Sequence, residues 1–230
     1  MTTERPIIFS GEMVRAILDG EKTQTRRIAK VTSEGCPPGF LTPLAGFVPR
    51  RPEQHVEYCP YGQPGDRLWV KESYALTGEL ANARLRDFGF PRESLRDHLR
   101  YRADADGYDE TVQRWRPSIH MPRWASRITL EITGVRIERL NEISEADAIA
   151  EGVERTVTDD GWRRYATPAE ELAGLPPVRS ARASFKTLWE SIHGPGSWDA
   201  NPWVWALTFD VIRENVDMVK KQEQKQCQDQ

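Results

Sequence analysis

The strongest constraint on the fold is an alternating segment near the C-terminal end of the chain. Trp203, Trp205, Leu207, Phe209 and Val211 place an apolar side chain at every second position, which predicts a β-strand with a buried face. A strand this apolar needs a core to pack against. The chain has 230 residues, of which 38% are hydrophobic and 29% charged. It is therefore long enough for a sizeable core, and its composition is that of a globular protein.

The other periodic segments alternate between the two kinds of secondary structure. Further strands are expected at residues 5–9, 22–28, 68–70 and 128–137, the last with a bulge at Gly134. Helices are expected after three serine N-caps, which are Ser10, Ser144 and Ser180. The first helix ends before Gly20, a residue suited to the position after a helix C-terminus. We therefore predict a mixed α+β domain over residues 1–212 and a polar tail over 213–230, which is either a helix or coil.

Three polar segments, at about 29–62, 73–127 and 154–200, are predicted to be insertions, the second of them a lid with short helices near 79–87 and 92–99. No apolar run approaches the roughly 18 residues of a membrane helix, and no signal peptide is visible. Cys36, Cys59 and Cys227 do not form a disulfide framework. We expect a cytoplasmic protein that does not bind membranes. Its oligomeric state is left open.

The sequence lacks the motifs of several common chemistries. It has no phosphate-binding glycine loop, no dinucleotide fingerprint, no serine elbow and no zinc-deaminase pattern. The candidate ligands for a zinc site are Cys36, His55 and Cys59 with His98 or His120. They lack the closely spaced ligand pairs that are typical of such sites. We therefore expect no metal and no cofactor.

Residues 20–27 place a lysine, a threonine and two arginines directly after the first helix. A lysine whose pKa is lowered by burial can act as a base toward a threonine hydroxyl. A regular strand would point Lys22 and Thr25 to opposite faces, so they converge only if Lys22 belongs to the preceding turn. The alternative is an exposed edge strand with no chemical role.

A second candidate region is a cluster rich in arginine and tryptophan, within a chain of net charge −3. Its residues are Arg114, Trp115, Arg116, His120, Arg123, Trp124 and Arg127. Guanidinium groups bind phosphates and indole rings stack on bases, so the cluster is typical of a nucleic-acid contact. Solvated arginines around buried tryptophans give the same pattern, and this alternative stays open.

The pattern Gly20-x-Lys22-x-x-Thr25-x-Arg27 resembles the signature of the ASCH family, a branch of the PUA-like fold. In the same order, residues 65–70, 128–140, 143–153 and 203–212 resemble further conserved segments of that family. Residues 115–124 and 198–203 add to this resemblance. Taken together, these segments make the chain similar to ASCH proteins of phages and prophages. The resemblance covers the strands and the first helix, which is under half of the chain.

This resemblance implies a pseudo-barrel of mixed β-sheet with helices at its rim, and binding of RNA or a modified nucleoside. Bacterial members similar in these motifs are amidohydrolases that deacetylate N4-acetylcytidine. Their lysine and threonine match Lys22 and Thr25, and their glutamate matches Glu151. The implied roles are a base for Lys22, orientation of that lysine or proton relay for Glu151, and phosphate or oxyanion binding for Arg27, with Arg26 beside it.

Two classes of function follow from these observations. One is hydrolysis of an N-acyl amide on a nucleobase by the Lys22, Thr25 and Glu151 set. The other is a non-catalytic module that binds RNA, with DNA as an alternative, through Arg114, Trp115, Arg116, Arg123 and Trp124. A phage-related interaction protein that only reuses the fold is a third and weaker hypothesis.

Overall fold

The computed structural model describes residues 2–29, 56, 58–80, 92–107, 109–156, 161–165 and 176–228. The chain divides into two compact units, each built from separate segments. The first consists of Met1–Asp19, Gly65–Glu131 and Asp210–Gln230, and the second of Gly20–Pro64 and Ile132–Phe209. We describe each unit by itself.

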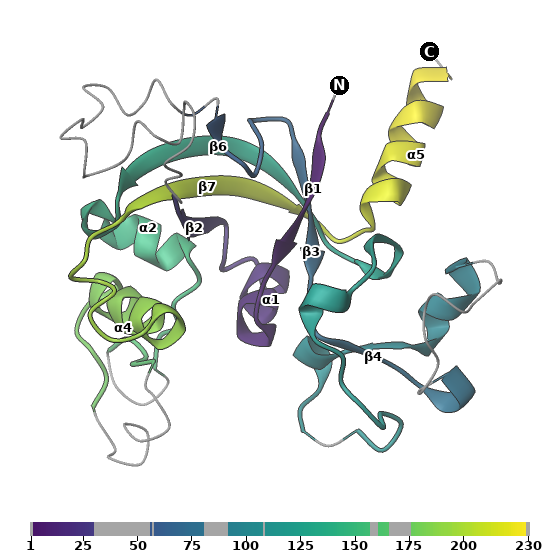
Figure 1. Ribbon diagram of the computed structural model, residues 1–230, viewed down its shortest axis with the longest axis horizontal. Coiled ribbons are helices and arrows are strands. Elements are labelled where there is room, and N and C mark those ends of the chain that lie inside the picture. Colours follow the sequence, from purple (N-terminus) through teal and green to yellow (C-terminus); the bar gives the residue numbers. More distant parts are fainter. Residues whose placement is uncertain are drawn as a thin grey trace, which may run out of the picture. The chain divides into compact units, whose positions relative to one another are not determined.

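The five longest strands belong to one mixed sheet with the order β1-β3-β6-β7-β2 (Figure 1). They are β1 (Glu4–Ile8), β2 (Gln24–Ile28), β3 (Arg67–Lys71), β6 (Thr129–Arg139) and β7 (Trp203–Ile212). The pair β1–β3 is parallel, whereas β3–β6 and β2–β7 are antiparallel. The mixed α+β class is thus confirmed. The sheet as described is open, because β1 and β2 are edge strands.

The first unit holds β1, α1 (Gly11–Leu18), β3 and a separate two-stranded sheet of β4 (Tyr74–Leu76) and β5 (Leu99–Tyr101). Short 3₁₀ helices, among them Arg92–His98, connect these elements. Buried Tyr74, Leu76 and Met121 form a small core under β4 and β5. Part of the segment predicted to be an insertion and lid therefore has a core of its own. The predicted helix near 79–87 lies mostly outside the described residues.

The polar C-terminal segment forms α5 (Val216–Gln228) in the first unit. Val216 and Val219 are its buried apolar residues. Arg67 on β3 donates to Glu223 on this helix and lies 3.2 Å from Glu131 on β6. The sequence does not decide between helix and coil here, and the structure shows a helix that packs on its unit through Val216 and Val219, with Arg67 as a polar contact.

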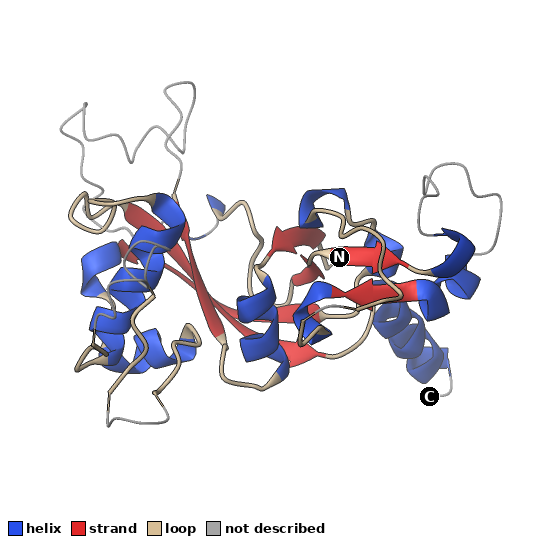
Figure 2. Ribbon diagram, turned by 90° about the horizontal axis from the view of Figure 1, so that it is seen from below, coloured by secondary structure: helices blue, strands red, loops and turns tan. Residues whose placement is uncertain are grey.

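The second unit holds β2, α2 (Glu145–Ala150), α4 (Ala181–His193) and most of β6 and β7. The predicted N-caps are confirmed, because Ser144 Oγ accepts a hydrogen bond from Asp147 N at 3.0 Å and Ser180 Oγ accepts one from Ala183 N at 3.1 Å. The helices α2 and α4 pack against each other (Figures 1 and 2). Their buried residues form one hydrophobic core with the neighbouring strand, including Ala148, Phe185, Trp189, Trp198 and Val204.

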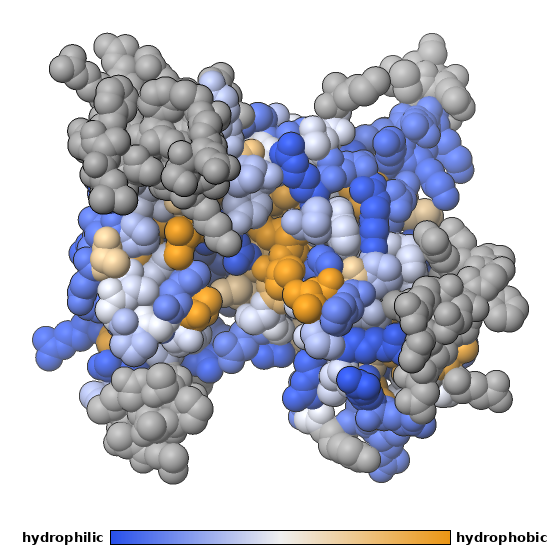
Figure 3. Space-filling model, viewed as in Figure 1, coloured by the Kyte–Doolittle hydropathy of each residue, from blue (hydrophilic) through white to orange (hydrophobic). Residues whose placement is uncertain are grey.

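The strand predicted from the alternating segment near the C-terminal end is confirmed as β7. Alternation predicts one buried face, but residues on both faces of this strand are buried. Trp205, Leu207 and Phe209 are buried as expected, but Val204 and Ala206 on its other face are buried as well. Hydrophilic residues cover much of the described surface on the face shown in Figure 3. Among the described residues, no helix is long and apolar enough to cross a membrane.

Candidate functional site

Lys22 lies between the turn that ends α1 and the first residue of β2. The turn begins at Gly20, whose φ of +80° is a left-handed conformation that favours glycine. Lys22 then forms an isolated antiparallel bridge with Glu151, and Thr23 N donates to Ala150 O at 2.8 Å. The sequence argument required Lys22 to belong to the turn, whereas the structure places it in this bridge, two residues before β2 begins.

The side chain of Lys22 is held by one residue at the C-terminal end of α2. Its Nζ donates to Glu151 Oε2 at 2.7 Å and to the Glu151 carbonyl oxygen at 2.7 Å. The carbonyls at a helix C-terminus lack partners within the helix, and a lysine can satisfy them. Both side chains are almost fully buried, with exposed fractions of 1% for Lys22 and 4% for Glu151. The structure thus brings together two predicted site residues that lie 129 positions apart.

Arg26 holds the other oxygen of the same carboxylate. Its Nη1 donates to Glu151 Oε1 at 3.1 Å, while its Nε donates to Glu138 Oε1 at 2.8 Å. Its Nη2 lies 3.4 Å from Asp147 Oδ2. Arg136 on β6 lies 3.5 Å from Glu138 and 3.3 Å from Asp147. Each oxygen of Glu151 therefore has its own cation, which fixes the orientation of the carboxylate.

Thr25 and Arg27 both lie in β2, on either side of Arg26 in the sequence. Thr25 pairs with Leu207 of β7 and is 3% exposed. Arg27 pairs with Trp205 and is partly exposed. Because they are two residues apart in a strand, their side chains share a face, which is opposite to that of Arg26.

Burial changes the proton affinity of several groups in this region. It lowers the pKa of Lys22, against the opposing influence of the Glu151 carboxylate. It also lowers the pKa of Arg27, partly offset by Tyr61 and Glu151. Burial and the Arg27 charge lower the pKa of His193, at the C-terminal end of α4. The candidate site therefore has a lysine that loses its proton more readily than usual, beside an arginine in a poorly solvated environment.

The arginine and tryptophan cluster lies in the first unit, whereas Lys22, Thr25, Arg26, Arg27 and Glu151 all lie in the second. Arg123 donates to Asp217 from Nε at 3.0 Å and from Nη2 at 2.7 Å, and it also contacts Glu4. Arg127 pairs with Glu72 at 2.9 Å and with Asp104 at 2.6 Å. The charge of these two arginines is thus matched by carboxylates within the unit.

The other members of the cluster have different surroundings. The Arg102 guanidinium lies 5.3 Å from the centre of the partly exposed Trp115 ring. Trp124 packs against the small core under β4 and β5. The backbone of Arg116 pairs with that of Tyr74, and Arg114 is exposed. Of the predicted cluster, Arg114 and Trp115 are therefore best placed for a ligand.

Sequence reasoning missed the partners of Arg26 and the group around Arg27. Glu138 lies 112 residues from Arg26, and no local pattern links them. Tyr61 belongs to a segment that was predicted as loop, and His193 to a helix that was predicted from its apolar face. Cys36 and His55, considered for zinc, lie outside the described residues, while Cys59 is buried.

The geometry of the second unit is that of a buried lysine and glutamate, with Arg26 on the second oxygen of the glutamate. Within the described part of the chain, no group of His, Cys, Asp and Glu side chains is arranged to hold a metal ion. Comparisons with protein-family models, with curated proteins and with solved structures find no match to this chain.

Proposed function

We propose that this protein binds a modified nucleoside or an RNA nucleotide beside Lys22 and hydrolyses an acyl amide on its base. In this proposal the chain is an ASCH-like protein, and its open mixed sheet belongs to the PUA-like class. The observation that carries the proposal is the buried contact between Lys22 and Glu151. The motif resemblance assigned catalytic roles to these two residues, and the fold places their side chains 2.7 Å apart.

The reaction needs a base that gives its proton back. Neutral Lys22 accepts a proton from water or from the Thr25 hydroxyl while that oxygen bonds to the acyl carbon. The amide C–N bond then breaks, and the proton passes from the Lys22 ammonium to the departing nitrogen of the base. If Thr25 is the nucleophile, water hydrolyses the resulting ester and releases the acid. The lowered pKa of Lys22 supports this role, because it increases the neutral fraction.

The two arginines have different roles in this proposal. Arg26 contacts the carboxylates of Glu138, Asp147 and Glu151, so we assign it to holding Glu151 rather than to ligand binding. Arg27 is partly exposed, and burial lowers its pKa. We assign Arg27 to the negative charge that develops on the acyl oxygen, or to a phosphate of the ligand.

The test is to incubate the protein with N4-acetylcytidine and to follow cytidine by chromatography. The proposal predicts release by the wild type and a loss of at least about 100-fold in Lys22→Ala, the range typical of a lost general base. Lys220→Ala, at an exposed position on α5, is the matched control and keeps full activity. Circular dichroism of each variant checks that it folds. Release that is equal in Lys22→Ala and wild type contradicts the proposal.

The second candidate function is RNA binding without turnover in the first unit. The observation that favours it is the exposure of Arg114 next to the partly exposed ring of Trp115. If it is correct, affinity for single-stranded RNA falls with salt and Arg114→Ala reduces that salt dependence. Arg123→Ala changes it less, because Arg123 already pairs with Asp217. A salt-independent affinity contradicts this function.

A further inference from the structure

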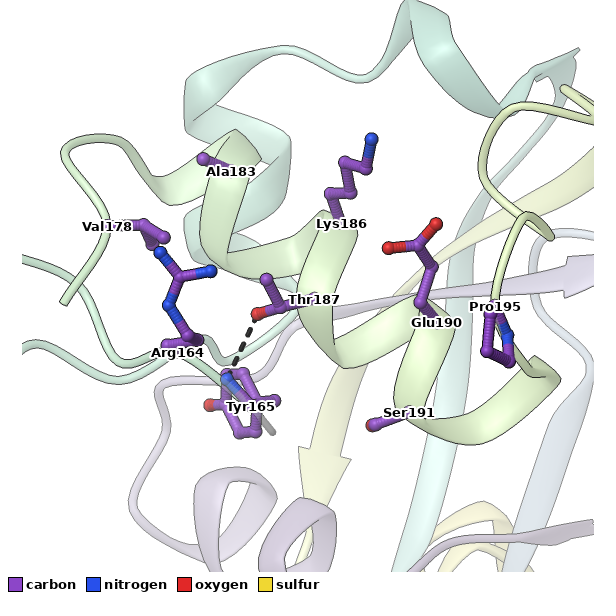
Figure 4. A pocket seen from close by; sticks show the side chains of 9 residues that line it. All are labelled: Arg164, Tyr165, Val178, Ala183, Lys186, Thr187, Glu190, Ser191 and Pro195. Carbon is purple, nitrogen blue, oxygen red and sulfur yellow. Dashed lines mark hydrogen bonds between the residues drawn. The ribbon is translucent and has the colours of Figure 1, made fainter. Parts of the chain in front are cut away.

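A cavity of about 460 Å³ lies in the second unit against one side of α4 (Figure 4). This volume is within the range of small-molecule binding sites, which are about 300–1,000 Å³. None of the described residues that line it belongs to the Lys22 network. Its polar side chains come from α4 and from residues 164 and 165, and its apolar wall includes Val178, Ala183 and Pro195.

Two cations line this cavity. Arg164 Nε donates to the Pro176 carbonyl oxygen at 2.9 Å, which leaves its two Nη groups for other partners. No contact with a carboxylate is found for Arg164 among the described residues. Lys186 lies 3.6 Å from Asp199, but both side chains are substantially exposed, with fractions of 41% and 76%. Exposed ion pairs of this kind are weak, so Lys186 can exchange Asp199 for an anionic ligand at little cost.

Among the described residues that line the cavity, one has a carboxylate. Glu190 lies one helical turn after Lys186, and both project to the same side of α4 (Figure 4). The carboxylate is only partly exposed. A carboxylate repels a bare phosphate but accepts hydrogen bonds from the hydroxyls of a ribose. The combination of two cations and one carboxylate therefore favours a ligand that has both an anionic group and hydroxyl donors.

The remaining polar groups of the cavity are used within the protein. Thr187 Oγ1 accepts from Tyr165 N at 3.0 Å, and Ser191 Oγ donates to Leu188 O at 2.7 Å. The Tyr165 hydroxyl accepts from Glu154 N at 3.2 Å, which holds the ring in place. The Tyr165 ring also packs against the hydrophobic core of this unit, and the Arg163 guanidinium lies 4.9 Å from its centre, so the ring forms part of the cavity wall.

We propose that this cavity binds a ribonucleotide, with the phosphate on Arg164 and Lys186 and the ribose hydroxyls on Glu190. The ligand is a ribonucleoside monophosphate, either free or as one residue of an RNA strand. The proposal is independent of the amide hydrolysis, because it uses no residue of the Lys22 network. It adds a second contact for a nucleotide within the same unit.

The experiment is a calorimetric titration of the full chain with cytidine 5′-monophosphate, its 2′-deoxy analogue and inorganic phosphate. We expect the ribonucleotide to bind more tightly than either of the other two. Arg164→Ala weakens binding of the ribonucleotide by about tenfold or more, as expected for a lost hydrogen bond to a charged group. Glu190→Ala removes the preference for the ribonucleotide over the 2′-deoxy analogue. Arg179→Ala, at an exposed position outside the cavity lining, is the matched control and leaves both affinities unchanged.

Three outcomes would overturn the proposal: no binding of the ribonucleotide, equal affinity for inorganic phosphate, or an equal loss in Arg164→Ala and Arg179→Ala. Arg164→Ala separates the two proposals, because it is expected to weaken this binding and to leave cytidine release from N4-acetylcytidine unchanged. A short RNA that competes with the monophosphate assigns the cavity to an RNA strand. A short RNA that does not compete assigns it to a free nucleotide.

Discussion

Replacing Lys22 with methionine tests whether the lysine and Glu151 act as one buried pair. Lys22→Met keeps the length of the side chain but removes the donor to Glu151 Oε2 and to the Glu151 carbonyl oxygen. Breaking a buried ion pair from one side costs about 3–5 kcal/mol of stability, because a buried charge is left without its partner. Arg26 still contacts Glu151 Oε1, so we expect a loss at the lower end, about 3 kcal/mol.

The reciprocal change, Glu151→Leu, leaves the Lys22 ammonium buried without its carboxylate, and we expect a loss of similar size. In the double variant neither charge remains, so its loss is well below the sum of the two single losses. We expect a coupling free energy of about 2–3 kcal/mol. The assay is urea unfolding, followed by tryptophan fluorescence and by circular dichroism. Additivity within about 0.5 kcal/mol would refute the reasoning.

Three further predictions concern other parts of the same network and of the first unit. Burial lowers the pKa of Lys22, so the folded state holds fewer protons than the unfolded state between that lowered pKa and 10.5. The unfolding free energy of the wild type, relative to Lys22→Met, therefore rises with pH in this window, and a flat difference contradicts the claim. Burial raises the pKa of Tyr101 to about 12, so stability falls as the pH rises from about 10 to 12. Tyr101→Phe lacks this fall in alkaline urea titrations, and an unchanged slope would exclude Tyr101 as its source. Arg123→Ala removes the ion pairs to Glu4 and Asp217, and we expect faster amide hydrogen exchange in α5. Unchanged exchange would show that these pairs do not hold the helix.

The elements with a clear apolar period could be predicted from the sequence. The positions of α1 and α4 follow from serine N-caps and an apolar face, and β7 follows from its alternation. In contrast, α5 has few apolar residues, and its place depends on buried Val216 and Val219 together with ion pairs from Arg67 and Arg123. Such long-range pairs leave no local pattern, which is why the sequence could not decide between helix and coil.

The candidate site could be predicted only where its residues lie close together in the sequence. Lys22, Thr25 and Arg27 lie within six residues of one another, so a short motif identifies them. Glu151 required a resemblance, since nothing local connects it with Lys22. The role of Arg26 was not predictable at all, because it depends on which carboxylates of β6 and α2 the fold brings to it.

In the arginine and tryptophan cluster, the sequence indicated more binding residues than the structure leaves accessible. Composition and spacing indicated a positive surface, but positive charge in a sequence becomes a binding surface only where the fold leaves it unneutralised. Arg123 and Arg127 are paired with carboxylates from other segments of their unit. Arg114 is exposed, and it is therefore the arginine of this cluster whose removal is most informative.

The most direct test of the account is the rate of cytidine release from N4-acetylcytidine by wild type and Lys22→Ala at equal concentration. The account predicts steady release by the wild type and at least about a 100-fold lower rate in the variant. No release by the folded wild type, or the same rate in both proteins, would contradict it.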